Sequence, residues 1–556
     1  IRRWTSISQE PLPSMCVSRN ATGKKGNSMI PIPRQERIRE ILTDLVRIKS
    51  LSASPSGENE AARYIAVTLS RSLPEGDVTL VPIQGDALGR VFVIARVRAR
   101  PKTDRTIVLT GHFDVVGAEG YGSLESVAFD PDVCTRRIGE RNIPDEARRD
   151  LESGDYLFGR GVADMKFGIA LEMAFLEAAA ASPGSLGANL MMLAVPDEES
   201  DSAGMRAAIS ELARLQDSGE TFLACVNTEP CVGDGGSGRA MIHLGTIGKI
   251  MPLFYCVGRE THVGDYFEGC NAALVAAHLE TLCEADPSTS ETVDGRRLPP
   301  QSCLRMRDLR PHYAVTLPDR AVVFCNRLIV NETPASVLAG MRAVAAEALR
   351  RTDEQLRSAA CALGKQYGPG TAAPAVYTVD ELIRNGTGSE SDPTDLPGDV
   401  RDHAIAELGR VVRESGITGP AVVLGFLPPF YPPRRNRRTC RGEIACARAA
   451  EIAVKTAAAR GHDIDVREIF EGIMDLSYLG FQGAREELDP LSANMPFWGT
   501  EYGIPLDDLC RLDIPGINIG PIGKDAHKDT ERLNLPYSFG VLPPVLASAL
   551  ETLARS

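Results

Sequence analysis

The stretch TIVLTGHFDVV, residues 106–116, reads as a short apolar strand that ends on a histidine and an aspartate. Similar apolar runs lie at 91–97, 189–195 and 222–227, and a long helical pattern lies at 165–180. Short, almost uniformly apolar strands are typical of a sheet buried on both faces, and their alternation with helices favours parallel pairing. The sequence therefore predicts an α/β fold with a doubly wound, mainly parallel sheet.

The pattern changes after residue 245. Two strand-like runs and two helical runs predict a small α+β unit, at 248–258, 271–283, 320–330 and 336–351. The segment from about 364 to 400 is rich in Gly, Pro, Thr and Asp and predicts a connector, after which AVVLGFL (421–427) resumes the alternating pattern. We therefore expect one α/β domain interrupted by an inserted α+β domain. The expected division is an unassigned leader at 1–29, the α/β domain at 30–245 and 381–556, and the insertion at 246–380.

Composition restricts the classes of function. Of the 556 residues, 43% are hydrophobic and 24% are charged, which is ordinary for a packed globular protein and excludes a largely disordered chain. The formal net charge of −13 argues against a nucleic-acid partner, because an acidic surface repels phosphate backbones. No apolar run approaches the ~18 residues of a membrane span, so no membrane partner is expected.

The cysteines indicate the compartment. Thirteen cysteines are irregularly spaced without a CxxC pair, and residues 1–29 contain no apolar segment of the kind found in signal peptides. Disulfides persist in oxidising compartments and are rare in the cytosol. We therefore expect reduced thiols and a cytoplasmic protein.

Carboxylates and imidazoles follow the expected strands or begin the helix after them. They are His112, Asp114, Asp164, Glu198, Glu199, Glu229 and His527. In an open parallel sheet, sites form at the edge where the strands have their carboxyl ends. Each residue alone is compatible with a solvated loop, but clustered carboxylates would repel one another unless cations were bound. Imidazole together with carboxylate favours Zn²⁺ as the ion, with Mn²⁺ or Co²⁺ as alternatives.

Six motifs carry a resemblance to a known family. GHFDVV (111–116), LFGRGVADMKFG (157–168), PDEES (196–200), NTEP (227–230), GRETH…EGCNAA (258–273) and GPIGKDAHKDTERLN (520–534) resemble, in order and context, the M20 family of dinuclear metallopeptidases and deacylases. Within that family, MDLSYLGF (474–481) and NMPFWGTEYGIPL (494–506) look like the arginine-utilisation, RocB-like branch.

The resemblance implies a role for each matching residue at a two-metal site. His112 and Glu229 would bind one metal ion, Glu199 and His527 would bind the other, and Asp164 would bridge both. Asp114 would accept a hydrogen bond from the imidazole of His112 and so fix its tautomer.

The resemblance also implies residues that act on the substrate. Glu198 would be the general base, and His262 of the inserted lid would reach across a homodimer interface to the substrate carbonyl oxygen. Independently of the resemblance, Arg327 on an expected lid strand is a candidate to clamp a substrate carboxylate, with a surface salt bridge as the equal alternative and Asn326 as a weaker candidate. The charged segment at 135–150 looks like an insertion that could shape the mouth of the site.

The implied activity is hydrolysis of an amide bond in a small N-acyl amino acid or peptide, with a lid that forms a homodimer. The alternative is a non-catalytic scaffold or regulator on the same fold. Loss of the base or of a metal ligand would favour that alternative, and none of these residues is missing.

Overall fold

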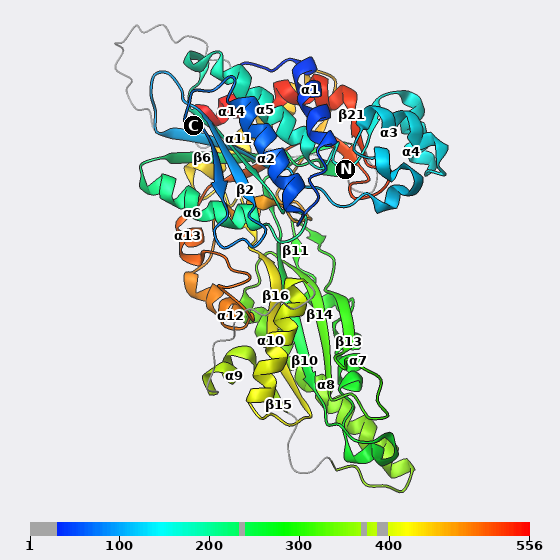
Figure 1. Cartoon of the computed structure of the whole chain (residues 1–556). Coiled ribbons are helices and arrows are strands. Elements are labelled where there is room, and N and C mark those ends of the chain that lie inside the picture. The colour runs from blue at the N-terminus through cyan, green and yellow to red at the C-terminus, as the bar shows by residue number, and fades with distance from the viewer. Residues whose placement is uncertain (1–29, 233–238, 369–374, 386–398) are drawn as a thin grey trace.

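The computed structural model describes residues 30–232, 239–368, 375–385 and 399–556, so the expected leader at 1–29 lies outside the described residues. A mixed eight-stranded sheet lies at the centre of the larger unit (Figure 1). Its strands, in spatial order, are β1 (Val78–Pro82), β2 (Val91–Val97), β5 (Asn189–Val195), β3 (Arg105–His112), β6 (Thr221–Asn227), β19 (Gly516–Ile519), β8 (Ala240–His243) and β18 (Ile464–Arg467).

Parallel pairing is concentrated in the middle of this sheet. Strands β5, β3, β6 and β19 run parallel to one another, and β18 runs parallel to β8. Antiparallel pairs join β1 to β2, β2 to β5, and β19 to β8. The predicted doubly wound, mainly parallel α/β fold is confirmed, with antiparallel pairs towards both sides of the sheet.

Helices cover both faces of the sheet, which explains why its strands are almost uniformly apolar. Ile107 and Leu109 of β3 pack on one face, and Val108 between them packs on the other. The first face is covered by α1 (Gln35–Arg47), α2 (Pro55–Leu69), α5 (Lys166–Ala180), α11 (Arg441–Ala458) and α14 (Leu542–Ala554). The second face is covered by α6 (Ala203–Asp217) and α13 (Leu506–Arg511).

The smaller unit, called the lid below, extends away from the larger one (Figure 1). Its five-stranded sheet has the order β13 (Ser302–Asp308), β14 (Arg320–Ile329), β10 (Gly248–Val257), β16 (Ala421–Tyr431) and β15 (Ala375–Thr378). All pairs are antiparallel except β15 with β16. One face packs against α7 (Ala272–Cys283) and α8 (Pro334–Ala362), and the other packs against α9 (Val379–Asn385) and α10 (Val400–Glu414).

The lid takes in more of the chain than the sequence indicates. Residues 381–556 were expected to form the second part of the α/β domain, yet β16 pairs with β10 inside the lid sheet and α10 packs on that sheet. The expected connector at about 364–400 contains β15 and α9. A uniformly apolar run such as AVVLGFL is typical of any strand covered on both faces, so its composition does not distinguish a parallel sheet from the centre of an antiparallel one.

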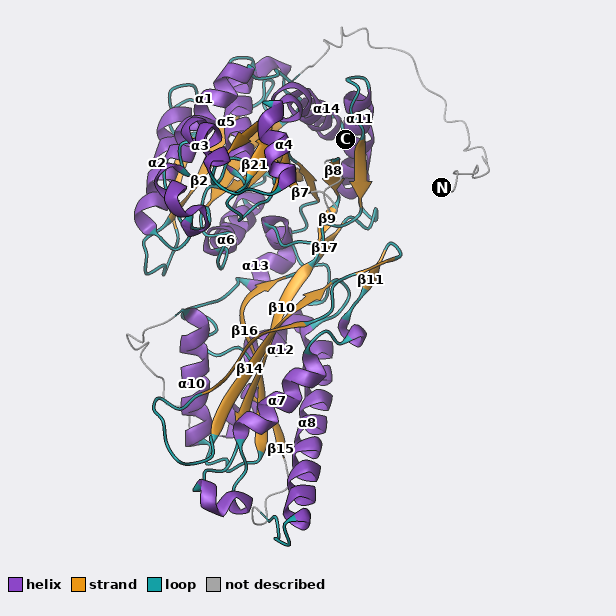
Figure 2. Cartoon of the chain, turned by 90° about the vertical axis from the view of Figure 1, so that its right-hand side faces the viewer, coloured by secondary structure: helices purple, strands orange, loops and turns teal. Residues whose placement is uncertain are grey.

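The chain passes between the two units along adjacent segments. Strand β9 (Gly245–Thr246) enters the lid and pairs with β17 (Arg434–Arg435), which leaves it (Figure 2). A short hairpin, β11 (Thr292–Val293) and β12 (Arg296–Arg297), lies on the lid side of this junction (Figure 2). The short helix α12 (Asp489–Ala493) follows this junction in the chain but lies beside the lid, where the backbone oxygen of Asn494 accepts from the N–H of Phe426 in β16 at 2.9 Å (Figure 2).

The segment predicted to be an insertion folds as two short helices beside the larger unit. These are α3 (Pro131–Arg137) and α4 (Asp145–Ser153). They precede a four-stranded sheet of β4 (Tyr156–Phe158), β21 (Arg532–Asn534), β20 (Ile522–Lys524) and β7 (Cys231–Val232). Within the described residues, the length and apolar character needed to span a bilayer are not found in any helix.

Candidate metal centre

The predicted polar residues meet at the carboxyl edge of the central strands. His112 is the last residue of β3, Glu198 and Glu199 follow β5, and Glu229 follows β6. Asp164 lies just before α5, and His527 lies in the loop between β20 and β21. Because β5, β3 and β6 are parallel neighbours, their carboxyl ends lie side by side and bring these residues together.

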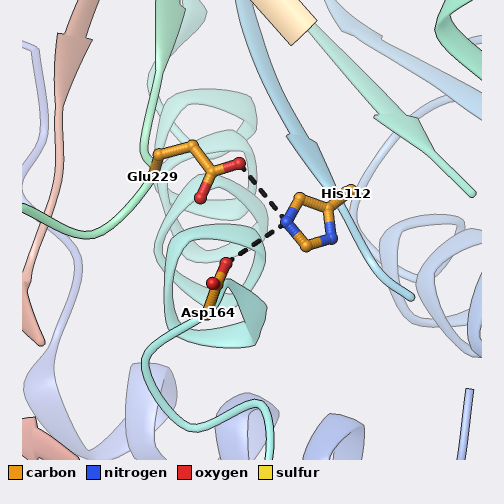
Figure 3. Close-up of side chains that lie close together, drawn as sticks. All are labelled: His112, Asp164 and Glu229. Carbon is orange, nitrogen blue, oxygen red and sulfur yellow. Dashed lines mark ion pairs between the residues drawn. The ribbon is translucent and has the colours of Figure 1, made fainter. Parts of the chain in front are cut away.

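One group consists of His112, Asp164 and Glu229. The Nε2 atom of His112 lies 3.3 Å from Glu229 Oε1 and 3.4 Å from Asp164 Oδ1 (Figure 3). One imidazole nitrogen and two carboxylate oxygens within 4.8 Å of one another can surround a single cation. His112 is 1% exposed, so this group lies at the buried end of the site.

A second group consists of Asp164, Glu199 and His527. The Nε2 atom of His527 lies 2.9 Å from the Glu199 carboxylate and 3.3 Å from Asp164 Oδ2. Asp164 therefore directs one carboxylate oxygen to each group, which is the arrangement that a carboxylate bridging two ions requires. The His527 side chain is 52% exposed, so the second group lies at the open side of the site.

The carboxylates of this site need positive charge beside them, either as bound cations or as protons on the neighbouring imidazoles and carboxyl groups. Hydrogen bonds to Asp164 and Glu199 raise the pKa of His527 to about 10. Burial raises the pKa of Glu229 to about 8, with the Asp164 charge adding to it and His112 opposing it. Such raised pKa values indicate that the carboxylates stabilise positive charge, which a bound divalent cation would supply in place of protons. Nitrogen and oxygen donors suit Zn²⁺, Mn²⁺ or Co²⁺.

Asp114 links the two halves of the site. Its carboxylate accepts hydrogen bonds from the backbone N–H groups of Glu198 (3.1 Å) and Glu199 (3.2 Å) and from the hydroxyl of Ser52 (2.7 Å). His112 Nδ1 lies 3.1 Å from the Asp114 backbone oxygen and 3.5 Å from Oδ1. The shorter contact of the imidazole is thus to the carbonyl, while the carboxylate also fixes the turn that carries both glutamates.

Glu198 lies beside the two groups without joining either. Its Oε2 atom is 3.9 Å from His112 Nε2, and its side chain is 11% exposed. Burial raises the pKa of Glu198 well above its usual range, and the neighbouring charges of Glu229 and Asp475 act in the same direction. A buried carboxylate that is not one of the grouped ligands is available for proton transfer.

Sequence reasoning missed a buried ion pair that supports the site. Arg160 Nη1 contacts Glu531 Oε2 at 2.6 Å, and both side chains are almost completely buried. Glu531 Oε1 accepts hydrogen bonds from the backbone N–H groups of Ala163 (3.2 Å) and Asp164 (3.3 Å). Arg160 Nη2 donates to the backbone oxygen of His527 at 3.0 Å. The pair therefore holds the backbone of Asp164 and of the exposed His527 in position.

We expect Arg160→Met to lower the thermal midpoint of unfolding and to weaken metal binding. Removing one partner of a buried ion pair leaves the other charge uncompensated, which costs about 3–5 kcal/mol of folding free energy. Differential scanning fluorimetry and metal titration measure both effects. The matched control is Arg136→Met, which removes an exposed arginine of α3. If the two variants have equal midpoints and equal metal affinities, Arg160 does not position the site.

The predicted insertion contacts the loop that carries His527. Asp150 of α4 accepts from Arg532 Nε at 2.7 Å and from Lys524 Nζ at 2.9 Å. These two cations flank the 525–531 loop, so α4 holds that loop from outside. The segment at 135–150 therefore contributes to the wall beside His527.

The structure does not bring the predicted lid residues to this site. His262 is exposed and follows the end of β10 that points away from the junction; its Nδ1 accepts from the backbone N–H of Gly264 at 3.0 Å. Both arms of the Arg327 guanidinium bind Glu332, at 2.8 and 2.6 Å, which is the salt-bridge alternative. Asn326 lies on β14 opposite Ser302 and is half-buried.

Comparison with known families gives a match over about half of the chain. The model of the family described as "Peptidase family M20/M25/M40" matches residues 108–389. That range begins in β3 and includes His112, Asp164, both glutamates after β5, and Glu229.

Two relatives from Bacillus subtilis (strain 168) match almost the whole chain. An uncharacterized protein, YqjN, is 32% identical over 94% of this chain and 97% of its own length. Protein RocB is 29% identical over 94% of this chain and 95% of its own length. Among solved structures, an M20 family metallo-carboxypeptidase, Sso-CP2 from Sulfolobus solfataricus, has a TM-score of 0.53 at 12% identity and covers 93% of this chain and 99% of its own. The chain is thus similar to these proteins in fold over nearly its full length.

Proposed function

The chain belongs to peptidase family M20/M25/M40, and we propose that it is a metal-dependent hydrolase of amide bonds in small N-acyl amino acids or peptides. The observation that carries this proposal is the placement of Asp164, whose two carboxylate oxygens face separate histidine–glutamate pairs. A further carboxylate, Glu198, lies next to both pairs and has no ligand role of its own.

The donor set supports two divalent ions. His112, Asp164 and Glu229 would hold one ion, and Asp164, Glu199 and His527 would hold the other. Zn²⁺ is the ion we favour for mixed imidazole and carboxylate ligands, with Mn²⁺ or Co²⁺ as alternatives. When bound, two such ions lower the pKa of a water molecule shared between them and polarise the substrate carbonyl.

The chain's own residues supply the proton transfers. Glu198 takes a proton from the attacking water and returns it to the leaving amine nitrogen, so that the amide is replaced by a carboxylate and an amine. Asp114 fixes the backbone of Glu198, which keeps the base aligned with the ligands.

We further propose that the lid forms a homodimer in which each site takes a residue from both chains. Strand β13 is an edge strand of the lid sheet and exposes Leu304 (53%) and Met306 (44%). An exposed apolar edge strand is a surface on which another strand can pair. Strand β10 spans ten residues, about 30 Å, between the junction and the segment with His262. His262 would therefore serve the partner's site, where it would stabilise the developing oxyanion.

We expect His262→Ala to lower kcat by about 10²–10³-fold with metal content unchanged, as for loss of an oxyanion donor. Mixing His262→Ala with Glu198→Gln chains should restore part of the activity, since a mixed dimer has one site with both residues intact. The control is His278→Ala, which removes an exposed lid histidine of α7. If subunit exchange is demonstrated and no activity returns, His262 does not act across the interface.

A metal-reconstitution screen tests the proposed activity. The chain is loaded with Zn²⁺, Mn²⁺ or Co²⁺ and assayed against N-acetyl and N-succinyl amino acids and dipeptides. We expect chelator-sensitive amide hydrolysis at about two ions per chain. Metal-loaded protein without activity on any of these classes would favour the non-catalytic scaffold or regulator instead.

We also propose a cytoplasmic location and a role in arginine utilisation. A cytoplasmic location is supported by the cysteines, since the eleven whose side chains the structure describes are all free thiols. A role in arginine utilisation rests on the motifs shared with the RocB-like branch and on the similarity to RocB over 94% of the chain.

A further inference from the structure

A cavity of about 440 Å³ lies in the lid, remote from the metal ligands. Its lining residues lie on the lid sheet, on the loop after β13 and on α10. Helix α10 lies beside that sheet in the unit that extends away from the larger one (Figures 1 and 2). Its charged lining residues are Arg307, Arg310, Arg320, Arg413, Asp319 and Asp402. Three of the four arginines are paired with carboxylates, Arg307 with Asp402, Arg310 with Asp308 and Arg320 with Asp319, so the excess positive charge comes from Arg413. The whole chain, by contrast, carries a net charge of −13.

The hydrogen-bonding capacity of these arginines is only partly used. The backbone oxygen of Arg413 accepts from the N–H of Gly416, but its guanidinium makes no hydrogen bond or ion pair with any other described residue. Arg307 donates from Nη2 to Asp402 Oδ1 at 2.6 Å, but its Nε is buried and has no acceptor among the described residues. Each guanidinium carries five N–H donors and cannot lose its charge, so these donors require an acceptor.

The other two arginines use part of their donors on one loop. Arg310 Nε donates to Asp308 Oδ1 at 3.1 Å, and its Nη1 donates to the backbone oxygen of Thr316 at 3.1 Å. Arg320 Nη1 donates to the backbone oxygen of Asp319 at 2.8 Å and lies 3.3 Å from its carboxylate. These contacts fix the two side chains at the wall of the cavity and leave further N–H groups of each free to bind an occupant.

We propose that this cavity binds a small oxyanion, a molecule with carboxylate or phosphate groups. Arginine forks bind both groups through paired N–H donors, and the Arg413 guanidinium has no carboxylate partner among the described residues, so an anion in the cavity would supply one. Leu309, Pro311 and Ile405 supply an apolar part of the wall against which a short carbon skeleton can pack. A volume of about 440 Å³ is in the range of small-molecule sites.

The cavity adjoins the segment that carries His262. The loop after β13, which contributes Arg310 to the wall, is hydrogen-bonded to that segment: Leu317 N–H donates to the Thr261 oxygen at 2.9 Å, and Val263 N–H donates to the Val315 oxygen at 3.3 Å. An occupant of the cavity would therefore contact the loop that supports His262. The binding site itself does not depend on the proposed hydrolase activity.

Isothermal titration calorimetry of the full-length, metal-loaded protein tests the proposal. Inorganic phosphate and tricarballylate are titrated separately at constant ionic strength, which distinguishes a phosphate from a carboxylate ligand. We expect saturable binding at one site per chain for at least one of them, and at least a tenfold loss of affinity in both Arg413→Ala and Arg413→Gln. The matched control is Arg305→Ala, because Arg305 also contacts Asp402, at 3.4 Å, but does not line the cavity; its affinity should stay within twofold.

Three results would overturn the proposal. The first is the absence of saturable binding for both probes. The second is equal affinity in the wild type and in Arg413 variants whose circular dichroism shows that they are folded. The third is loss of binding in Glu199→Ala, folded by the same criterion, because the anion would then be bound at the metal centre. Retained binding in that variant supports the lid site even if the proposed hydrolase activity is absent.

Discussion

Asp164→Ala is expected to remove both metal ions together and with them all metal-dependent turnover. Its Oδ1 faces His112, 3.4 Å away, and its Oδ2 faces His527, 3.3 Å away, so a single carboxylate serves both groups. Loss of a shared ligand leaves each group with one histidine and one glutamate, which is too few for tight binding of Zn²⁺. Mass-spectrometric metal analysis after gel filtration measures the content per chain.

Single-group variants provide the comparison for Asp164→Ala. His112→Ala and His527→Ala each remove a ligand from one group only, so each should retain metal at the other position. Asp164→Ala should also remain folded. The buried carboxylate of Asp164 carries a desolvation cost in free energy, and alanine removes that cost. Two ions per chain in Asp164→Ala would show that Asp164 is not the bridging ligand.

The central sheet and its ligand edge could be predicted because both follow from burial. A strand covered on both faces must be apolar along its length, as in β3 and β5, and polar residues can then occur only where the strand ends. His112 and Glu199 are recognisable for that reason. The same logic did not place AVVLGFL correctly, because β16 is covered on both faces within the lid.

The supporting residues of the site could not be predicted in the same way. Arg160 and Glu531 are 371 positions apart, and charged residues in loops are usually solvated. Only the return of the chain through β20 and β21 beside β4 brings them together. The structure identifies such a pair because both charged side chains are buried and in contact. The sequence contains no pattern that would link two loop residues so far apart.

The roles of the lid residues could not be predicted from the sequence for another reason. The lid histidine was placed in the inserted domain by its motif, but the number of chains needed to complete a site depends on how two lids meet. Within the described residues, Arg327 already has both arms on Glu332, so a substrate carboxylate would have to displace that pair. The strand register places Asn326 next to Arg327 on β14, where successive side chains point to opposite faces. The two residues therefore cannot both point into the same cleft.

The Asp114 carboxylate holds the backbone of both Glu198 and Glu199, but the two side chains can be changed one at a time. One carboxylate holds the backbone of both residues, so a change at Asp114 would disturb ligand and base together. A change confined to the end of the Glu198 side chain leaves that backbone and all five ligands in place. The proton-transfer role can therefore be tested without loss of metal.

Glu198→Gln is expected to lower kcat by about 10²–10⁴-fold while the metal content stays near two ions per chain, because glutamine keeps the shape of the side chain but accepts no proton. Steady-state assays on the best substrate from the metal-reconstitution screen measure this effect, alongside metal analysis of the same preparation.

Glu172→Gln is the matched control for this variant. Glu172 is a buried acid of α5 whose pKa burial raises well above its usual range, and its Oε1 accepts a hydrogen bond from Thr228 Oγ1 at 2.8 Å. Glu172 belongs to neither candidate metal-binding group, and the glutamine oxygen can accept the same hydrogen bond from Thr228, so this variant should retain activity. If Glu198→Gln is as active as Glu172→Gln at equal metal content, the base must be a group other than Glu198. If both variants lose activity together, the loss reflects disturbance of the buried carboxylates around Glu229 rather than loss of a proton acceptor.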